Sequence, residues 1–213
     1  MDKATSPRWR RRKEARPQEI IAAALAIFAE RGFAATRLDD IAARAGVTRG
    51  TLYLYFPSKE ELFKAVVRQF LLPIFARREE MLAAATGPTS DLLARFILSF
   101  PEAIAASPVS AIPKLVLSEA GNFPDLARFY VDEVLRRGRR LVRGLLRRGI
   151  ERGQFRNVDV DQVFYCVVAP LLVTMLWRHS LAPYDNDGPD LPALCRAHVD
   201  LLLHGLLKPG GAT

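Results

Sequence analysis

Residues 38–56 read LDDIAARAGVTRGTLYLYF and predict two short helices joined by a tight turn. Gly46 is expected to end the first helix, because the residue after a helix favours positive φ and glycine adopts it without strain. Thr48 can cap the second helix with its hydroxyl, and Leu52 should face back onto the first helix. Two helices joined by a short glycine-containing turn form the helix-turn-helix motif, whose second helix enters the DNA major groove.

The surface of the second predicted helix favours this interpretation over an ordinary corner between two helices, which the spacing alone allows equally well. Its outward positions carry hydroxyls, one guanidinium and a bare backbone position, without any acidic residue. They are Thr48, Arg49, Gly50, Thr51, Tyr53 and Tyr55. A solvated helix face normally mixes charges of both signs, whereas this face presents hydrogen-bond donors suited to phosphates and base edges.

Positive charge is unevenly spread over the 213 residues, whose net charge is +8. Residues 1–59 hold 12 Lys and Arg against 6 Asp and Glu, and residues 60–213 hold 19 against 17. The excess therefore lies with the predicted motif and indicates a polyanionic partner at one end of the molecule. Residues 1–16 hold seven of the basic residues and are expected to form a flexible arm along the DNA backbone or in the minor groove, with a solvated tail as the alternative.

Helical periodicity covers the rest of the chain and no strand pattern interrupts it, so we expect an all-α protein of about nine helices. Thr36 should cap the first helix of the motif, and Ser58 the long helix after it. Nine helices are expected. The first runs from Pro17 to Gly32, the next two form the motif, and the fourth runs from Ser58 to Ala85 with a kink at Pro73. The other five run from Thr89 to Ala106, from the break at Ser107-Pro108 to Glu119, from Pro124 to Arg152, from Asp159 to Leu181, and from Asp190 to Leu207.

Eight arginines lie along the expected helix from Pro124 to Arg152: Arg136, Arg137, Arg139, Arg140, Arg143, Arg147, Arg148 and Arg152. They could form a second nucleic-acid surface. A solvated charged face is the better interpretation, because Asp132, Glu133 and Glu151 can pair with them and no aromatic residue is interleaved.

The last two expected helices are more apolar than one core needs, which indicates a face buried against another copy of the chain. The longest apolar run, Val163 to Trp177, has 15 residues and contains Pro170. This run is shorter than the roughly 20 residues that span a bilayer, so we expect no membrane contact. Cys166 and Cys195 form no Cys-x-x-Cys pair and are expected to be reduced core thiols of a cytosolic protein, and the basic N-terminus lacks the apolar segment of a signal peptide.

An enzyme is a poor fit to this sequence. His179, His198 and His204 fall at no metal-binding spacing, no Ser or Cys nucleophile is placed beside them, and no glycine-rich phosphate loop appears. We therefore expect no catalytic residue, no metal and no cofactor. A general nucleoid-binding protein is the stronger rival, because it would also be basic.

Residues from Pro17 to about Phe63 resemble the tetracycline-repressor (TetR) family of bacterial transcription regulators. The matching positions are Ile21, Ala24, Phe28, Gly32-Phe33, Thr36, Ile41-Ala42, Ala45-Gly46-Val47, Gly50 to Phe56, Lys59-Glu60 and Leu62. The run from Val47 to Lys59 is highly specific. The remainder of the chain matches only in the number and order of its helices.

The resemblance implies a homodimer with a DNA-reading domain at residues 17–63, after an arm at 1–16. Residues 64–208 would bind a small molecule and dimerise through the last two helices. Arg49 and Gly50 would approach bases with Thr51 beside them, and Arg49 is the first choice for a guanine contact. Phosphates would be held by Thr36, Arg37, Thr48, Tyr53, Tyr55 and Lys59. Lys59 also lies in the first turn of the long fourth helix, where a helix N-terminus and a lysine suit a phosphate.

The implied mechanism is competitive allostery between a palindromic operator and a small effector of unknown identity. An effector among helices four to eight would swing the fourth helix and change the spacing of the two recognition helices. Proline breaks would let helices bend around a cavity, and each candidate wall residue could equally be plain core. The candidates are Phe70, Phe96, Phe100, Leu115, Phe123, Tyr130, Tyr165, Met175 and Trp177. Their apolar character suggests a hydrophobic or aromatic effector; repression is the family's usual mode, and the sequence identifies neither the operator nor the regulated genes.

Overall fold

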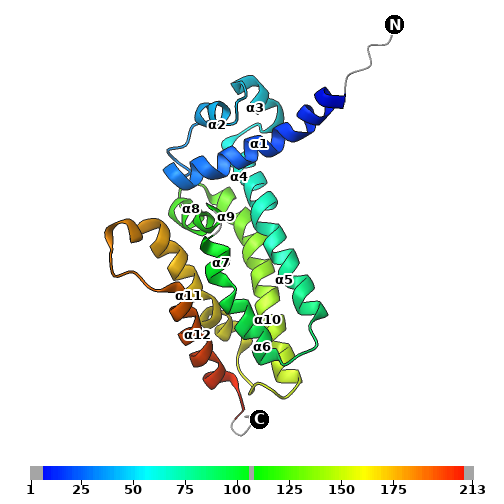
Figure 1. Cartoon of the computed structure of the whole chain (residues 1–213), viewed down its shortest axis with the longest axis vertical. Helices are drawn as coiled ribbons and strands as arrows, with labels where there is room; N and C mark the ends of the chain where they lie inside the picture. Colours follow the sequence, from blue (N-terminus) through cyan, green and yellow to red (C-terminus); the bar gives the residue numbers. More distant parts are fainter. Residues whose placement is uncertain (1–6, 106–107, 209–213) are drawn as a thin grey trace.

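A small group of helices lies at one end of a longer helical bundle (Figure 1). The computed structural model describes residues 7–105 and 108–208. Within these ranges the only extended pairing is an isolated bridge between Phe155 and Leu207, so the predicted all-α class is confirmed.

The terminal group consists of α1 (Pro7–Arg31), α2 (Leu38–Arg44), α3 (Arg49–Tyr55) and the start of α4 (Lys59–Val66). Gly32 (φ 82°) follows α1 and Gly46 (φ 65°) follows α2, which confirms the left-handed glycine predicted between the helices of the motif. Leu52 is fully buried against this core, as expected.

Two predictions about this group were wrong. The first helix begins at Pro7 instead of Pro17, because residues 8–16 are mostly strong helix formers and Pro17 is accommodated inside the helix. The part of the expected arm before residue 7 lies outside the described residues. Thr36 does not cap α2, whose N-cap is Arg37 without a side-chain bond. The Thr36 hydroxyl is buried and donates instead to the Gly32 carbonyl at 2.6 Å.

The predicted long fourth helix is present as α4, the π-helical segment η1 (Val67–Leu71) and α5 (Leu72–Ala84), with Ser58 as its N-cap. The irregularity expected at Pro73 appears as the wider turn of η1. Proline lacks an N–H and clashes with the carbonyl four residues before it, and a π-turn just upstream relieves that clash.

The remaining helices lie close to their predicted positions, with two of them divided. A break at Ser99 separates two helices ahead of Pro101, and a π-helical segment interrupts the arginine-rich helix. The elements are α6 (Thr89–Leu98), α7 (Phe100–Ala105), η2 (Pro108–Ala111), α8 (Ile112–Glu119), α9 (Pro124–Tyr130), η3 (Val131–Leu135), α10 (Arg136–Glu151), α11 (Val160–Ser180), η4 (Ala182–Tyr184) and α12 (Leu191–Leu206).

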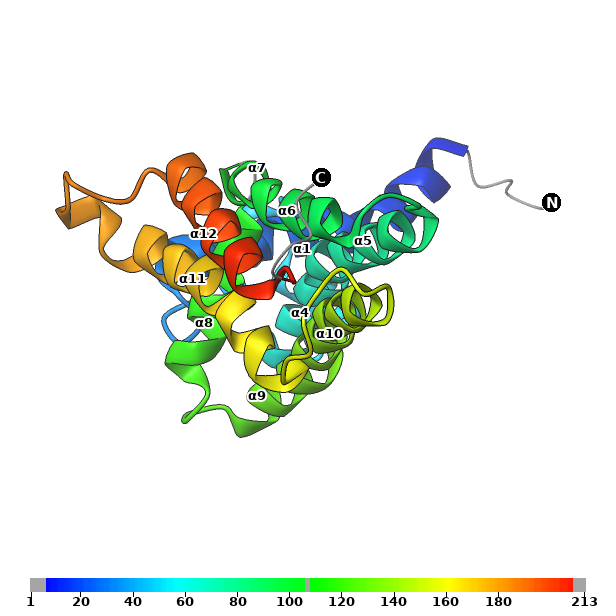
Figure 2. The same cartoon turned by 90° about the horizontal axis from the view of Figure 1, so that it is seen from below.

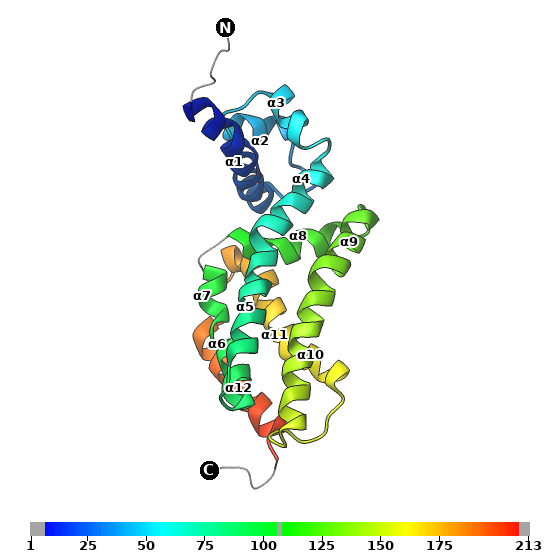
Figure 3. The same ribbon diagram turned by 90° about the vertical axis from the view of Figure 1, so that its right-hand side faces the viewer.

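Two hydrophobic clusters fill the described part of the molecule. The first, which we call the upper core, runs without interruption from α1–α4 into α8 and α9. The second, the lower core, joins α6, α10, α11 and α12. Figure 3 shows α8 and α9 lying directly below α1 and α4, with α5 and α10 descending side by side from this level. The small group therefore shares its core with part of the bundle.

Several arginines of α10 bond to neighbouring helices, so they do not form only a solvated charged face. Arg136 pairs with Asp132 as expected, whereas Glu133 pairs with Arg68 of η1. Three others tie α10 to its neighbours: Arg137 to Glu79 at 2.7 Å, Arg143 to Asp161 at 2.7 Å, and Arg148 to the Leu82 carbonyl at 2.9 Å.

Helix α11 lies close to the bounds predicted for it, Asp159 to Leu181, and extends beyond the 15-residue apolar run on both sides. By length and composition alone its 21 residues could cross a membrane, with a mean hydropathy of 1.7. Only 22% of the window is buried inside the chain. Figure 2 shows α11 and α12 together on one side of the bundle. An uncovered apolar helix requires either lipid or a second protein surface.

Two glycines of α10 give a matched test of its packing. A Cβ built on Gly149 would lie 2.1 Å from the ring of Phe155, whereas one built on Gly144 meets nothing within 4 Å. Gly149→Ala should lower the free energy of unfolding by about 1–3 kcal/mol through overpacking, and Gly144→Ala should raise it by up to about 1 kcal/mol through helix propensity. Urea unfolding of both variants measures this, and similar effects of the two would contradict the packing described here.

Candidate functional site

Helix α3 presents the candidate nucleic-acid surface at the tip of the molecule (Figure 1). The Thr48 hydroxyl accepts a hydrogen bond from the Thr51 backbone N–H at 3.1 Å, which confirms the predicted N-cap. The hydroxyls of Thr48 and Thr51 also share a hydrogen bond of 2.9 Å. This pair fixes the start of α3, so the side chains that follow project from a well-defined first turn.

Arg49 is the only charged side chain on α3, and it is 62% exposed. Its guanidinium lies 3.1 Å from the Asp39 carboxylate of α2 and donates to the Tyr53 hydroxyl at 3.4 Å. The bond to Tyr53, followed by the charge of Asp39, raises the pKa of Arg49. The free chain therefore holds Arg49 fully charged at the surface, bridging the two helices of the motif.

The other expected DNA-contacting positions differ in accessibility. Arg37, Gly50 and Tyr53 are exposed, and Thr51 and Tyr55 are partly buried. Sequence reasoning missed Leu54, which is 83% exposed on α3. Its position one turn after Gly50 could have identified it, because it lies outside the spacing of the buried Leu52 and Phe56. An exposed leucine can contact the methyl group of a thymine.

Lys59 has a different environment from the one predicted for a phosphate contact. Its ammonium donates to the carbonyls of Phe33 (2.8 Å), Ala34 (3.0 Å) and Thr36 (3.1 Å), and it lies 4.6 Å from the centre of the Phe33 ring. Burial lowers the pKa of Lys59, although Glu60 and Glu119 oppose the shift. All three N–H donors are occupied, so Lys59 holds the turn between α1 and α2 in the free chain.

The same turn contacts the bundle. The Ala34 N–H donates to the Glu119 carboxylate at the end of α8, at 3.2 Å. The ring of Phe33 lies 4.9 Å from that of Phe123, edge to face, and 5.5 Å from those of Phe28 and Phe63. Phe123 was expected on a ligand cavity but forms this joint between the motif and the bundle.

A cavity of about 170 Å³ lies between α5, α6, α10 and α11, at the boundary of the upper and lower cores. Four of the nine candidate wall residues line it: Phe96, Phe100, Tyr130 and Met175. The other five do not. Besides Phe123, these are Phe70, Leu115, Tyr165 and Trp177. Leu115 is buried core, and Tyr165 is exposed on α11, where its hydroxyl accepts from Arg139.

Residues that sequence reasoning missed complete the cavity wall. Leu71, Phe75 and Arg78 repeat at helical spacing along one side of η1 and α5, and Gly138 and Phe164 face them. This spacing is visible in the sequence and could have identified the face. Among the residues that the structure describes, Arg78 is the only charged one on the wall.

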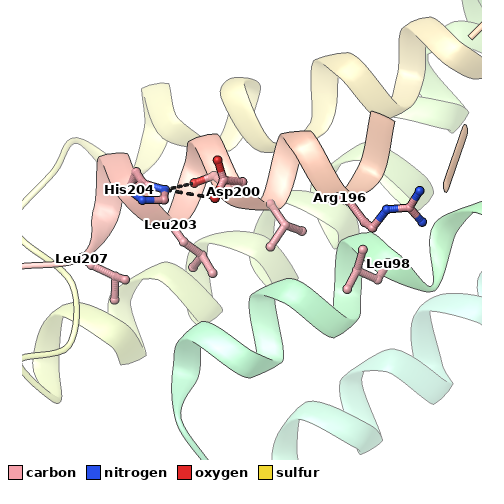
Figure 4. A pocket seen from close by; sticks show the side chains of 7 residues that line it. Leu98, Arg196, Asp200, Leu203, His204 and Leu207 are labelled. Atoms are coloured by element: carbon pink, nitrogen blue, oxygen red, sulfur yellow. Dashed lines mark hydrogen bonds and ion pairs between the residues drawn. The ribbon is translucent and has the colours of Figure 1, made fainter. Parts of the chain in front are cut away.

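A second hollow is an open groove between α6 and α12, with a volume of about 400 Å³. Figure 4 shows Leu98 of α6 beside Arg196 at one end of this groove and Leu203 and Leu207 toward the other end, with Asp200 and His204 of α12 bonded to each other. This groove is more open to solvent than the cavity between α5, α6, α10 and α11.

The sequence matches models of both halves of one family. Residues 20–66 match bacterial regulatory proteins of the tetR family, and residues 83–191 match the tetracyclin repressor-like C-terminal domain. The HTH-type transcriptional repressor KstR2 of Mycolicibacterium smegmatis is 34% identical over 199 residues, which cover 92% of this chain and 93% of the relative. The chain belongs to the tetR family of bacterial regulatory proteins.

Solved structures agree with this assignment. The regulator FadR of Bacillus subtilis in complex with stearoyl-CoA superposes with a TM-score of 0.74 at 26% identity, covering 88% of this chain and 98% of that one. The ketosteroid regulator KstR2 of Mycobacterium tuberculosis gives 0.69 at 31% identity, covering 91% and 96%. The TetR-family chain described here is a DNA-binding transcriptional regulator, and these relatives are regulators, not enzymes.

One expectation about the histidines was wrong. Ser110 lies beside His179, with its hydroxyl 2.8 Å from Nε2. Burial lowers the pKa of His179, and the neighbouring Arg178 and Lys114 lower it further. The charged groups that act on this imidazole are thus cationic, unlike the carboxylate that supports a catalytic histidine. The contact docks η2 against the end of α11. Among the described residues no cluster of three His, Cys, Asp or Glu could hold a metal ion.

Substitution of Lys59 distinguishes a structural role of this side chain from a phosphate contact. Lys59→Met should lower the free energy of unfolding by about 2 kcal/mol, because three carbonyls lose a charged donor. Lys64→Met is the control on the same helix, since Lys64 makes one ion pair with Glu61, and its loss should be below about 1 kcal/mol. Chemical denaturation gives both values. If Lys59→Met kept full stability and lost only affinity for DNA, the phosphate role would be restored.

Proposed function

We propose that this regulator is a cytoplasmic homodimer that binds a palindromic operator and releases it when an apolar effector enters the internal cavity. The observation that carries the proposal is the single upper core, which connects the helix-turn-helix to the cavity wall. Residues 17–63 would serve as the DNA-reading unit, and residues 64–208 would bind effector and dimerise.

The uncovered side of α11 and α12 supports dimerisation. On α11 the exposed residues Cys166, Ala169 and Val173 recur at helical spacing, and on α12 Ala197 and Leu201 do the same. Val173 is 57% exposed and Leu201 is 72% exposed. Cys166 is thus a surface thiol in the single chain and not a core thiol as expected. Small side chains beside exposed aliphatic ones suit close packing of helices, so two copies would bury this side in a four-helix bundle.

Two copies would present two α3 helices to successive major grooves, with half-sites about 34 Å apart or a multiple of it. Arg49, Gly50 and Thr51 would face bases, and Arg37, Thr48, Tyr53 and Tyr55 would contact phosphates. Leu54 joins this surface. Thr36 and Lys59 would shape it from within, because their donors are already bonded to main-chain carbonyls.

Effector control follows from the size and position of the cavity. Its volume of about 170 Å³ is smaller than that of most ligand sites, roughly 300–1,000 Å³. A larger effector must therefore displace the wall, including Tyr130 and Val134 of the upper core. A coupling of about 1–3 kcal/mol would weaken operator binding roughly 5- to 150-fold. The stearoyl-CoA of FadR and the description of KstR2 as a ketosteroid regulator support an apolar effector.

Arg49 tests sequence-specific recognition against general DNA coating. Arg49→Ala should reduce affinity for the operator at least tenfold, since a bidentate guanine contact contributes about 1–3 kcal/mol, and should reduce affinity for random duplex much less. Arg44→Ala is the control, because Arg44 lies on α2 and pairs with Glu30. Fluorescence anisotropy on an operator selected from genomic DNA measures both. Protection without sequence preference in footprinting would identify a nucleoid protein instead.

Leu201 tests the dimer. Leu201→Glu should produce monomers at micromolar concentration, because two carboxylates would be buried in the interface, and should abolish operator binding although α3 is unchanged. Met81→Glu is the control, since Met81 is 43% exposed on α5, which lies on the other side of the bundle from α11 and α12 (Figure 2). Sedimentation equilibrium gives the oligomeric state. A dimeric Leu201→Glu protein would place the interface elsewhere.

A further inference from the structure

The internal cavity contains a cation without a counter-ion. Arg78 is partly buried, and its guanidinium lies 4.8 Å from the ring of Phe96, a cation–π contact. Within residues 7–105 and 108–208 no hydrogen bond or ion pair holds it. The neighbouring carboxylate in sequence, Glu79, is engaged by both arms of Arg137 at 2.8 and 2.7 Å.

This arrangement is energetically unfavourable for a chain that only needs a core. A buried charge without a partner loses hydration that a single cation–π contact offsets in part. Burial lowers the pKa of Arg78 accordingly. Arg77, one residue earlier, is exposed, and Arg137 and Arg148 are paired. Arg78 is thus distinguished from its neighbours by its place on the cavity wall.

A second polar group faces the same cavity from another helix. Tyr130, the last residue of α9, is 8% exposed and lines the cavity, and its hydroxyl makes no hydrogen bond in the described part of the chain. Burial raises the pKa of Tyr130, so its hydroxyl stays protonated and can donate. The remaining wall is apolar. The cavity therefore offers an apolar chamber with one guanidinium and one hydroxyl.

We propose that the effector is an amphipathic anion, an apolar body carrying a carboxylate or a phosphate group, and that Arg78 binds its anionic oxygens. A guanidinium fork matches both groups with two parallel hydrogen bonds. The Tyr130 hydroxyl binds a second oxygen of the effector. This inference rests on the proposed effector site and adds to it the charge of the ligand.

The test compares matched ligands that differ only in their head group. The full-length protein is titrated calorimetrically with n-alkanoates from hexanoate to tetradecanoate, with the alcohols of equal length, and with the corresponding n-alkyl phosphates. The wild type should bind an anionic member at least about tenfold more tightly than its alcohol, because a charge-assisted hydrogen bond contributes about 1.4 kcal/mol or more. Preference for the alkanoate or the alkyl phosphate then identifies carboxylate or phosphate as the bound group.

Variants of the cavity locate the effect. Arg78→Met should bind the anion and the alcohol equally, Arg78→Lys should keep part of the preference, and Arg140→Met, an exposed arginine of α10, should behave as wild type. Gly138→Leu should block all the ligands, since a Cβ at Gly138 already lies 3.4 Å from the Phe75 ring, whereas Gly144→Leu on the same helix should not.

Three results would overturn the proposal: equal affinity of the wild type for anion and alcohol, an unchanged preference in Arg78→Met, or no binding of any member of the series. Unfolding measurements on each variant keep a folding defect from being taken for lost binding. Operator affinity is measured separately without ligand. If it is intact while the ligand series fails, the charge of the effector is wrong and the DNA-binding regulator stands.

Discussion

The packing of Phe33 is the constraint on which the rest of the molecule depends. Its buried ring contacts Phe28 and Phe63 within the DNA-binding helices and Phe123 at the start of α9, and the ammonium of Lys59 covers its face. The core of the helix-turn-helix is therefore continuous with that of α8 and α9. Protein interiors are close-packed and deform by discrete rearrangements, so a displacement of α9 must either carry the turn after α1 with it or break this aromatic cluster.

Two helical segments extend down the bundle from the level of the upper core: α4 continues into α5, and α9 continues into α10. Each contains a π-helical segment beside the cavity, η1 before α5 and η3 before α10. Leu71 ends the first and Val134 and Leu135 lie in the second, and all three line the cavity. A π-turn interrupts the regular hydrogen bonding of the α-helix around it, and such turns often occur at functional sites. An effector that enlarges the cavity would press on the two places where these helices bend most easily.

Local chemistry explains why much of the fold could be predicted. The apolar periodicity repeats about once per helical turn, and the hydroxyls of Thr48 and Ser58 accept from backbone N–H groups three residues later. Both partners of each cap therefore lie in one short stretch of sequence. The environments of Lys59 and Arg78 could not be predicted from their neighbours in the sequence. The acceptors of Lys59 are carbonyls 23 to 26 residues away, which no side-chain pattern reveals, and Arg78 lies in a run of two arginines and two glutamates that resembles a solvated face. The cavity likewise depends on how helices distant in sequence pack, so four of nine wall residues were found.

The contrast between Arg49 and Lys59 shows how the structure selects its DNA-contacting groups. Arg49 bonds to an exposed carboxylate and an exposed phenol, and surface ion pairs of this kind contribute only about 0–1 kcal/mol. It can therefore exchange Asp39 for a guanine at little cost. Lys59 would have to leave three main-chain carbonyls without a donor, a larger loss that also loosens the turn supporting α2. The side chains available to contact DNA are therefore those whose present hydrogen-bond partners are exposed, so that water can replace the side chain when it moves to the DNA.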